Sequence, residues 1–375
     1  MNPHTAPLTG IKVVELARIL AGPWAGQTLA DLGADVIKVE SPEGDDTRRW
    51  GPPWIETDGE QSAAYFHACN RGKQSLVCDL NNEADRTKLL ELISDADVLI
   101  ENFKVGGLKQ YGLDADTLRE SNPSLIYCSI TGFGQDGPYS HRAGYDFMIQ
   151  GMSGIMDLTG EPDGSPQKMG VAFADIFTAL YSVIAIQSAL WKRQQTGKGQ
   201  HIDMALFDCM TGVLANQAMN YLASGHAPKR MGNKHPNIVP YQTFEVSDGH
   251  LIVAVGNDQQ FKRLCDVLMA PELTLDERFL SNALRVENRD ALERLLSPLI
   301  ASYTRDDLLR ALKDAVVPAG PINSLSDVFD DEQFIARGMR IDPDGVPGTR
   351  TPISFSDSEL NTGRRSPNLG SWPGK

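Results

Sequence analysis

A single carboxylate at the start of a long apolar stretch is the residue in this sequence best placed to do chemistry. Asp175 ends the segment GVAFAD (170–175), and the next sixteen residues, IFTALYSVIAIQSALW, contain no charge, proline or glycine. The pattern predicts a helix with Asp175 in its first turn, where unpaired N–H groups and the helix dipole favour an ionised carboxylate. Two roles remain open: a helix cap, or a half-buried nucleophile or base of the kind found at functional sites.

The overall composition limits the partners that the chain can have. It has 375 residues, of which 41% are hydrophobic and 22% charged, as in an ordinary globular protein of about two to three domain-sized units. Its net charge of −14 argues against nucleic acid or an anionic membrane as a partner, because phosphate binding needs a basic surface. A small anionic ligand stays possible where lysines and arginines gather locally.

Cysteine and histidine usage predicts a cytoplasmic protein without a metal. The five cysteines are scattered and never form a C-x-x-C pair, which favours reduced thiols over disulfides or zinc. The seven histidines show no H-x-x-x-H spacing. The first ten residues, MNPHTAPLTG, lack the basic and apolar regions of a secretory signal, and the apolar run 176–191 is shorter than the ~20 residues of a membrane span.

The first 130 residues alternate between strand and helix patterns. Strands are expected at 11–16, 34–40, 97–101 and 124–130, with helices at 24–32 and 83–93, an alternation typical of a parallel sheet. Residues 144–224 are mostly helical. A hairpin is expected at 241–246 and 250–255, followed by helices at 259–268, 289–303 and 305–315 and a strand-like piece at 353–355.

These patterns predict an α/β fold: a large, doubly wound, Rossmann-like domain interrupted by a smaller α+β domain. Residues 1–224 form the large domain and contain the site, residues 225–324 form the small domain, and residues 325–375 return to the large one.

Loops rich in glycine and cations follow the predicted strands. Such loops usually bind ligands in α/β proteins. Each one taken alone is equally consistent with an ordinary turn whose charges face solvent. Their cations are Arg18, Arg48, Arg71, Lys73, Lys104 and Arg142. A nicotinamide dehydrogenase is disfavoured, because no G-x-G-x-x-G follows a strand.

Ten of these segments, in this order, resemble the family III CoA-transferases, the group of formyl-CoA transferase and carnitine CoA-transferase. The resemblance runs from about Leu8 to about Pro352. It implies an interlocked, ring-like homodimer, a coenzyme A thioester as substrate, and no metal or permanently bound cofactor. The segments are ARILAGP, LGADVIKVE, GDDTR, NRGKQS, ENF, YCSITGFGQDGP, RAGYD, GVAFAD, TGKGQ and VPYQTFEVSDG.

The resemblance also implies roles for individual residues. The nucleophilic aspartate of the family falls on Asp175. Some members have arginines where this chain has Ser41 and Gln110, so Lys104, Lys109 and Arg142 become candidates for those contacts. The full set assigned to CoA is Arg18, Leu20, Ala21, Ser41, Cys78, Asp79, Leu80, Asn81, Asn102, Phe103, Lys104, Gln110, Arg142, Ala143, Gly144, Tyr145 and Asp146.

The reaction expected from this resemblance moves CoA from an acyl-CoA to a free acid through an aspartyl-CoA intermediate. Residues 238–261 look closest to the succinyl-CoA:glutarate and related dicarboxylate transferases, so succinyl-CoA is the expected donor. The loop Gly232, Asn233, Lys234 and His235 is assigned to the acceptor. A racemase of the same fold is the main alternative, but it uses a histidine where this chain has Tyr145, whose reference pKa is about 10.

Overall fold

The computed structural model describes residues 5–374, and its internal contacts divide the chain into two compact units. The first comprises the chain up to Met156, Lys168–His226 and the segment from Glu332 onward. The second comprises Asp157–Gln167 and Ala227–Asp331. Each has its own apolar core. The expectation about the N-terminal stretch falls partly on residues 1–4, which lie outside the described residues.

A six-stranded sheet forms the centre of the first unit. Its strand order is β5-β2-β1-β6-β7-β8, and every neighbouring pair is parallel. This is the order of a doubly wound sheet, in which successive strands are added on one side of β1 and then, from β6 onward, on the other side. The predicted α/β fold with a parallel sheet is confirmed. The strands are β1 (Lys12–Glu15), β2 (Asp35–Glu40), β5 (Gln74–Val77), β6 (Val98–Glu101), β7 (Ile126–Thr131) and β8 (His201–Ala205).

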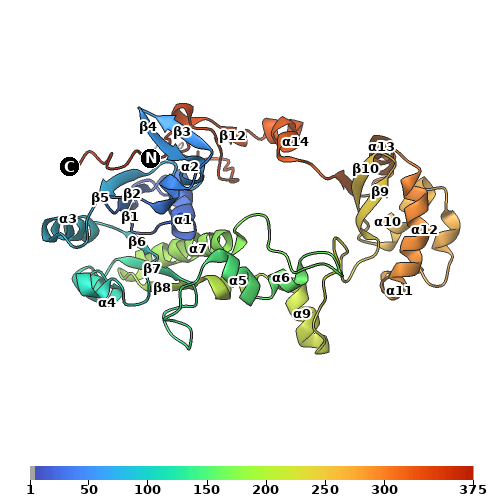
Figure 1. The fold of residues 1–375 in the computed structure, drawn as a ribbon, viewed down its shortest axis with the longest axis horizontal. Helices are drawn as coiled ribbons and strands as arrows, with labels where there is room; N and C mark the ends of the chain where they lie inside the picture. The colour runs from blue at the N-terminus through green and yellow to red at the C-terminus, as the bar shows by residue number, and fades with distance from the viewer. Residues whose placement is uncertain (1–4, 375) are drawn as a thin grey trace. The chain divides into compact units, whose positions relative to one another are not determined.

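Helices cover both faces of this sheet (Figure 1). On one face α1 (Ala21–Asp31) packs against α7 (Phe173–Thr196), which also contacts α8 (Leu206–Gly212). The other face is covered by α3 (Glu83–Ser94) and α4 (Ala115–Ser121). Since α1 follows β1 and α7 precedes β8 in a parallel sheet, both helices begin at the carboxyl edge of the sheet.

Two glycines let α1 lie close to the end of β1. A Cβ on Gly22 would stand 2.2 Å from the Cβ of Ala17, and a Cβ on Gly26 would stand 1.8 Å from Oε2 of Glu15. The helix therefore starts at Ala21, earlier than expected, with Pro23 in its first turn, where a missing N–H is tolerated.

Helix α7 is longer than the apolar run that predicted it. With 24 residues and a mean hydropathy of 1.5 in its most apolar window, it has the length and composition to cross a membrane. It is also a core helix, because Ala179, Val183 and Ile186 pack in the cluster that includes α1 and the sheet. Packing of one apolar side of a helix against the sheet is common in α/β proteins.

The second unit is built on a three-stranded antiparallel sheet. It contains β9 (Tyr241–Val246), β10 (Gly249–Ala254) and β11 (Ala319–Pro321), with the expected hairpin between β9 and β10. Arg285 is buried there, donating to the backbone carbonyls of Val239 and Phe279 and pairing with Asp258. The helices of this unit are α10 (Asp258–Val267), α11 (Asn282–Glu287), α12 (Arg289–Ala301), α13 (Arg305–Asp314) and α14 (Leu325–Asp330).

The strand expected at 353–355 is wrong. Arg350 donates to the carbonyl of Ile353, and the chain there is irregular. Two strands of the central sheet, β5 and β8, escaped prediction because they are short and contain polar residues. Smaller elements of the first unit are η1 (Asp46–Arg49), β3 (Trp54–Thr57), β4 (Glu60–Ala63), α2 (Ala64–His67), η2 (Lys109–Tyr111), α5 (Asp146–Met152), α9 (Ala215–Ser224), α15 (Glu332–Ala336), β12 (Arg340–Ile341) and β13 (Gly348–Thr349). The short strands β3, β4, β11, β12 and β13, outside the central sheet, escaped prediction as well.

Candidate active site

The parallel sheet brings most of the sequence-predicted site residues to one edge. Leu20 and Ala21 follow β1, Ser41 follows β2, and residues 78–81, 102–104 and 142–146 follow β5, β6 and β7. Because carboxyl ends of parallel strands meet at one edge, these segments line the edge where such sheets bind ligands. Gln110 lies in η2, between β6 and α4.

Two hydrogen bonds join the loop after β1 to the loop after β6, at the point where the strand order reverses. The side-chain amide of Asn102 accepts from the backbone N–H of Arg18 at 3.0 Å and donates to the Arg18 carbonyl at 2.7 Å. The Arg18 guanidinium, on the exposed side, pairs with Asp46 at 2.7 Å. Asn102 and Arg18 thus meet at the crevice where doubly wound sheets take their ligands.

Asp175 lies in the first turn of α7, two residues inside the helix start. Ala172 stands at the cap position and offers no capping side chain. The cap comes instead from Asp146, whose Oδ1 accepts from the N–H groups of Ala174 at 2.8 Å and Asp175 at 3.4 Å. Asp175 is therefore not needed as a cap, which removes the structural explanation for a carboxylate at this position.

Burial changes the charge state expected for Asp175. Desolvation, together with the negative charge of the nearby Asp146 carboxylate, raises its pKa to about 7. The expectation that the helix start would favour the ionised form is overturned. Among residues 5–374, no hydrogen bond to the Asp175 carboxylate is found, so its oxygens are available to a substrate.

A buried glutamine holds Asp146 in place. Gln150, at 0% exposure, donates to Asp146 Oδ2 at 2.7 Å and accepts from the N–H of Met169 at 2.9 Å. The close approach of Gly132 and Gly144, where a Cβ on either would stand within 2.5 Å of the other's Cα, sets the loop that leads to Asp146. The exposed Tyr145 ends this loop.

Tyr65 is a site neighbour that the sequence analysis missed. Burial raises the pKa of its phenol to about 12, and the carboxylates of Asp175, Asp146 and Asp45 oppose its ionisation as well. Its ring packs edge-on against Trp50 at 5.3 Å. At neutral pH Tyr65 is thus a neutral O–H donor within electrostatic reach of Asp175. Its only sequence signal was a pair of aromatic residues within an unremarkable segment.

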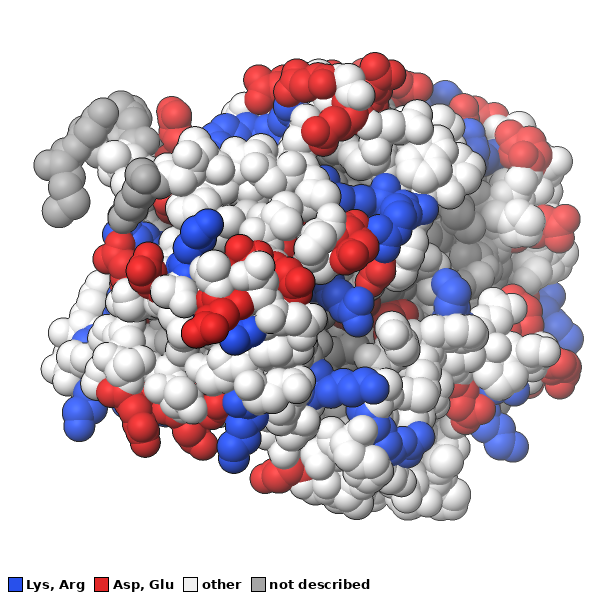
Figure 2. All heavy atoms as spheres, turned by 60° about the vertical axis from the view of Figure 1, so that its left-hand side comes forward, with Lys and Arg blue, Asp and Glu red and all other residues white. Residues whose placement is uncertain are grey.

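Three of the six loop cations are structural. Arg48 pairs with Glu40 at 2.7 Å, Arg71 pairs with Asp31 at 2.6 Å, and Lys73 pairs with Glu15 at 2.8 Å, all largely buried. Arg18, Lys104 and Arg142 remain exposed. The Arg142 guanidinium lies over the Tyr139 ring at 4.6 Å. The face in Figure 2 mixes cations with acids rather than gathering one sign.

The remaining CoA positions after β5 form a compact turn. Cys78 is buried, while Asp79 accepts from the N–H of Asn81 at 2.9 Å. The Tyr111 hydroxyl reaches Asn81 at 3.4 Å, which joins this turn to η2. Leu80 is half-buried there, and Phe103 is half-buried at the end of β6.

The predicted acceptor loop belongs to the second unit. Gly232 takes a left-handed φ of 59°, Lys234 pairs with Glu293 at 2.6 Å, and Asn233 reaches Thr243 at 3.4 Å. His235 Nδ1 accepts from the N–H of Asn237 at 3.1 Å, and burial beside Arg289 lowers the His235 pKa. His235 is thus neutral near pH 7, and Lys234 already has a carboxylate partner.

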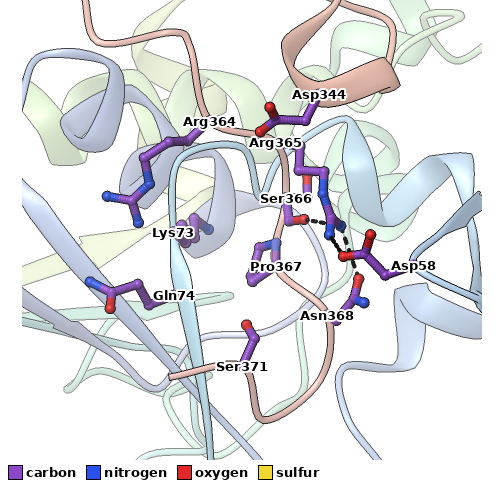
Figure 3. Close-up of a pocket in the computed structure, with 10 residues that line it drawn as sticks. All are labelled: Asp58, Lys73, Gln74, Asp344, Arg364, Arg365, Ser366, Pro367, Asn368 and Ser371. Atoms are coloured by element: carbon purple, nitrogen blue, oxygen red, sulfur yellow. Dashed lines mark hydrogen bonds and ion pairs between the residues drawn. The ribbon is translucent and has the colours of Figure 1, made fainter. Parts of the chain in front are cut away.

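A surface depression of about 340 Å³ lies elsewhere on the first unit (Figure 3). Arg365 contacts Asp58 and Asn368 at its rim. Lys73, one of the six loop cations, lines it, but none of the residues assigned to CoA or to the acceptor does. Within residues 5–374, no group of three or more metal-ligating side chains is found.

Comparison with known proteins identifies the chain. The model of CoA-transferase family III matches residues 8–371. This chain belongs to CoA-transferase family III. It is 57% identical to the succinate–glutarate CoA-transferase of Agrobacterium fabrum, covering 97% of this chain and 93% of the relative. It is 41% identical to the succinyl-CoA:glutarate CoA-transferase of Mus musculus over 97% of this chain and 84% of that one.

A solved structure has the same fold. The crystal structure of a CAIB/BAIF family protein from Brucella suis is 68% identical, with a TM-score of 0.89 over 98% of this chain and 97% of that one. The resemblance inferred from the motifs is confirmed, and so is the enzyme class: this family III CoA-transferase uses CoA thioesters as substrates.

Replacing Asp175 with asparagine is expected to stabilise this CoA-transferase at pH 8 and to leave it unchanged at pH 4. The pKa of Asp175 is about 7 in the folded chain but about 3.9 in an unfolded one. As pH rises from about 4, the unfolded chain loses the Asp175 proton while the folded chain keeps it. The free energy of unfolding of the wild type therefore falls with pH, and this fall levels off above about pH 7. Thermal unfolding at both pH values measures the difference.

The exposed first-turn residue Asp208 of α8 provides the control. Asp208→Asn removes a favourable helix-start charge and should lower stability slightly at pH 8. Equal thermal midpoints for the wild type and Asp175→Asn across this range would contradict the raised pKa.

Proposed function

We propose that this enzyme moves CoA from succinyl-CoA to a small dicarboxylic acid, with glutarate as the leading acceptor, through a covalent aspartyl-CoA on Asp175. The observation that carries the proposal is a half-buried carboxylate, without a hydrogen-bond donor among the described residues, at the carboxyl edge of the sheet, with a pKa of about 7. Desolvation of this kind makes a carboxylate a competent nucleophile. The names of the two glutarate relatives favour the substrates.

The steps exchange one acyl bond at a time. The Asp175 carboxylate attacks the thioester carbonyl, and the C–S bond breaks. CoA departs as the thiolate, and the succinyl group is now joined to Asp175 in a mixed succinyl–aspartyl anhydride. The thiolate attacks the aspartyl carbonyl and expels succinate, which forms aspartyl-CoA. The acceptor carboxylate then displaces the thiolate to form a second anhydride. Attack by the thiolate on the acceptor acyl carbon gives the new acyl-CoA and restores Asp175.

Neighbouring groups favour this sequence. The neutral Tyr65 phenol can donate to the oxyanion that forms at each attack. Asp146 is fixed by Ala174 and Gln150, so it orients the start of α7 rather than reacting. The segments after β1, β5, β6 and β7 would hold CoA, with Arg18, Lys104 and Arg142 available for its phosphates.

We also propose a homodimer with intertwined chains. The outer side of α7 exposes Leu180, Ile184 and Trp191 at helical spacing, with Ile184 57% and Trp191 66% exposed. Helix α9 has no buried residue at all, yet carries Met219 and Leu222. Apolar side chains gathered in this way mark surfaces that another chain covers.

A reducing compartment suits this enzyme, and we place it in the cytoplasm. Scattered cysteines without C-x-x-C pairing favour reduced thiols, and all five are free and buried in the described chain.

Asp175→Asn is expected to lower turnover by several orders of magnitude while the protein stays folded. The amide keeps the shape but cannot attack the thioester, and loss of a nucleophile commonly costs this much. The measurement is CoA transfer from succinyl-CoA to glutarate, combined with hydroxylamine trapping and peptide mapping of Asp175. Asp208→Asn should retain wild-type turnover and labelling. Substantial transfer by Asp175→Asn would eliminate the covalent route.

Dicarboxylates are expected to be better acceptors than formate or carnitine. Truncating a cation that binds a buried carboxylate leaves that charge unpaired. Lys234→Ala should therefore raise the acceptor KM and spare the half-reaction with succinyl-CoA, because the acceptor would share the Lys234 ammonium with Glu293. His235→Ala should raise the acceptor KM as well, by removing a neutral hydrogen-bonding side chain. Mass spectrometry of CoA products from mixed acids measures the preference. The exposed Lys262→Ala is the control, and faster turnover with formate or carnitine would reassign the substrate.

Dilution of the enzyme to nanomolar concentration is expected to yield no folded monomer. Interlocked interfaces are large and apolar, above the ~2,000 Å² of ordinary complexes. Mass photometry reads the oligomeric state directly. Ile184→Glu, on the exposed side of α7, should reduce the yield of dimer, whereas Leu90→Glu, at an exposed apolar position of α3, should not. A stable, folded monomer would refute the intertwined arrangement.

A further inference from the structure

A closed cluster of buried charges lies under the loop that follows β1. Lys38 and Lys73 both contact Glu15, with Nζ–Oε distances between 2.8 and 3.1 Å, and none of these side chains is more than 1% exposed. Replacing a buried ion cluster with apolar residues of the same volume is often neutral or stabilising. Stability alone therefore gives no reason for these three charges, and the proposed chemistry uses none of them directly.

The other contacts of the cluster go to the backbone of the loop Ala17–Pro23. Lys38 Nζ donates to the carbonyl of Ala17 at 2.8 Å, and Lys73 Nζ donates to the carbonyl of Pro23 at 2.8 Å. Asp45 pairs with Lys38 at 2.9 Å and accepts from the N–H of Ile19 at 3.3 Å. Three charged side chains thus hold the loop at its beginning, middle and end.

The middle of the loop is strained. Ile19 has a φ of 74°, in the left-handed region that β-branched residues avoid. Its carbonyl accepts from the thiol of the fully buried Cys69 at 3.5 Å, so both of its backbone polar groups are held. Such a conformation persists only where its surroundings impose it, and it is found preferentially at functional sites.

The held loop borders the proposed reaction centre. Helix α1 starts at Ala21, directly after Ile19 and Leu20, and packs beside α7, whose first turn contains Asp175. Tyr65 lies within the electrostatic reach of both Asp45 and Asp175. A change in the path of residues 19–21 would therefore shift the start of α1, which packs against the helix that contains Asp175.

We propose that Lys38 and Asp45 are positioning residues that hold Ile19 in its left-handed conformation and so align the thioester with Asp175. They act through the loop and do not touch the substrate. The inference rests on the proposed function, because it needs the reaction at Asp175 to occur beside this loop.

The test compares two buried carboxylates of the same unit. Asp45→Asn removes the charge that holds Lys38 and Ile19 and is expected to lower kcat about 100-fold, since a misplacement of about 1 Å costs that much. The KM for succinyl-CoA should change less than about threefold. Asp31→Asn is the matched control, because Asp31 pairs with Arg71 at 2.6 Å and contacts Thr351 instead of the loop. It should lose similar thermal stability and keep wild-type kcat.

A second variant keeps the test decisive if Asp45→Asn does not fold. Ile19→Pro leaves every charge in place, but the proline ring fixes φ at about −65°, so the loop cannot keep its left-handed conformation and kcat should fall in the same way. Wild-type kcat in folded Asp45→Asn or Ile19→Pro, or equal losses in Asp45→Asn and Asp31→Asn, would overturn the positioning role. Hydroxylamine trapping on the wild type reports separately on the proposed function: absence of an Asp175 adduct refutes the covalent route, while the kcat comparison still decides the role of the loop.

Discussion

The buried carboxylate of Glu15 determines much of how the first unit is built. It ends β1 in the middle of the sheet and has no exposure to water, so it must be neutralised within the fold. Lys38 from β2 and Lys73 from the turn before β5 do this, and they tie three adjacent strands together. The same carboxylate requires glycine at position 26, because any Cβ there would stand 1.8 Å from Oε2. A single buried charge thereby links the strand, the loop after it and the helix beyond.

The start of α7 shows an electrostatic competition that burial wins. A helix N-terminus stabilises an anion by about 0.3–1 kcal/mol, whereas burying a carboxylate costs far more unless it is paired. Asp146 uses the available N–H groups of the helix start and adds its own negative charge nearby. Asp175 therefore bears the cost of desolvation and receives little stabilisation from the N–H groups of the helix start. A carboxylate in this condition loses its unfavourable charge when it forms an anhydride or a thioester, which are the intermediates of the proposed covalent route.

Sequence patterns revealed the parallel sheet, the hairpin of the second unit and the family, because each depends on local periodicity or on motifs in order. They also placed Asp175 at a helix start. They could not give the direction of its pKa, since Asp146 comes from 29 residues earlier in the chain and burial is a tertiary property. For the same reason Arg48, Arg71 and Lys73 read as ligand cations, although Glu40, Asp31 and Glu15 neutralise them inside the fold. The sequence analysis also assigned residues 157–167 to the large domain, whereas they belong to the second unit. Their place there depends on long-range contacts such as that between Arg230 and Asp157.

An acidic protein that acts on an acidic ligand must divide its cations between structure and binding. The chain carries a net charge of −14, and the proposed substrate brings phosphates and a carboxylate of the same sign. The cations closest to the sheet are committed to buried carboxylates, so they supply rigidity without attracting ligand. The exposed Arg18, Lys104 and Arg142 sit on loops at the carboxyl edge, and Arg18 pairs there with Asp46. Local placement of a few exposed cations, rather than net charge, therefore decides whether an anionic thioester can approach Asp175, because screening limits the influence of distant surface charges to about 8–10 Å at physiological salt.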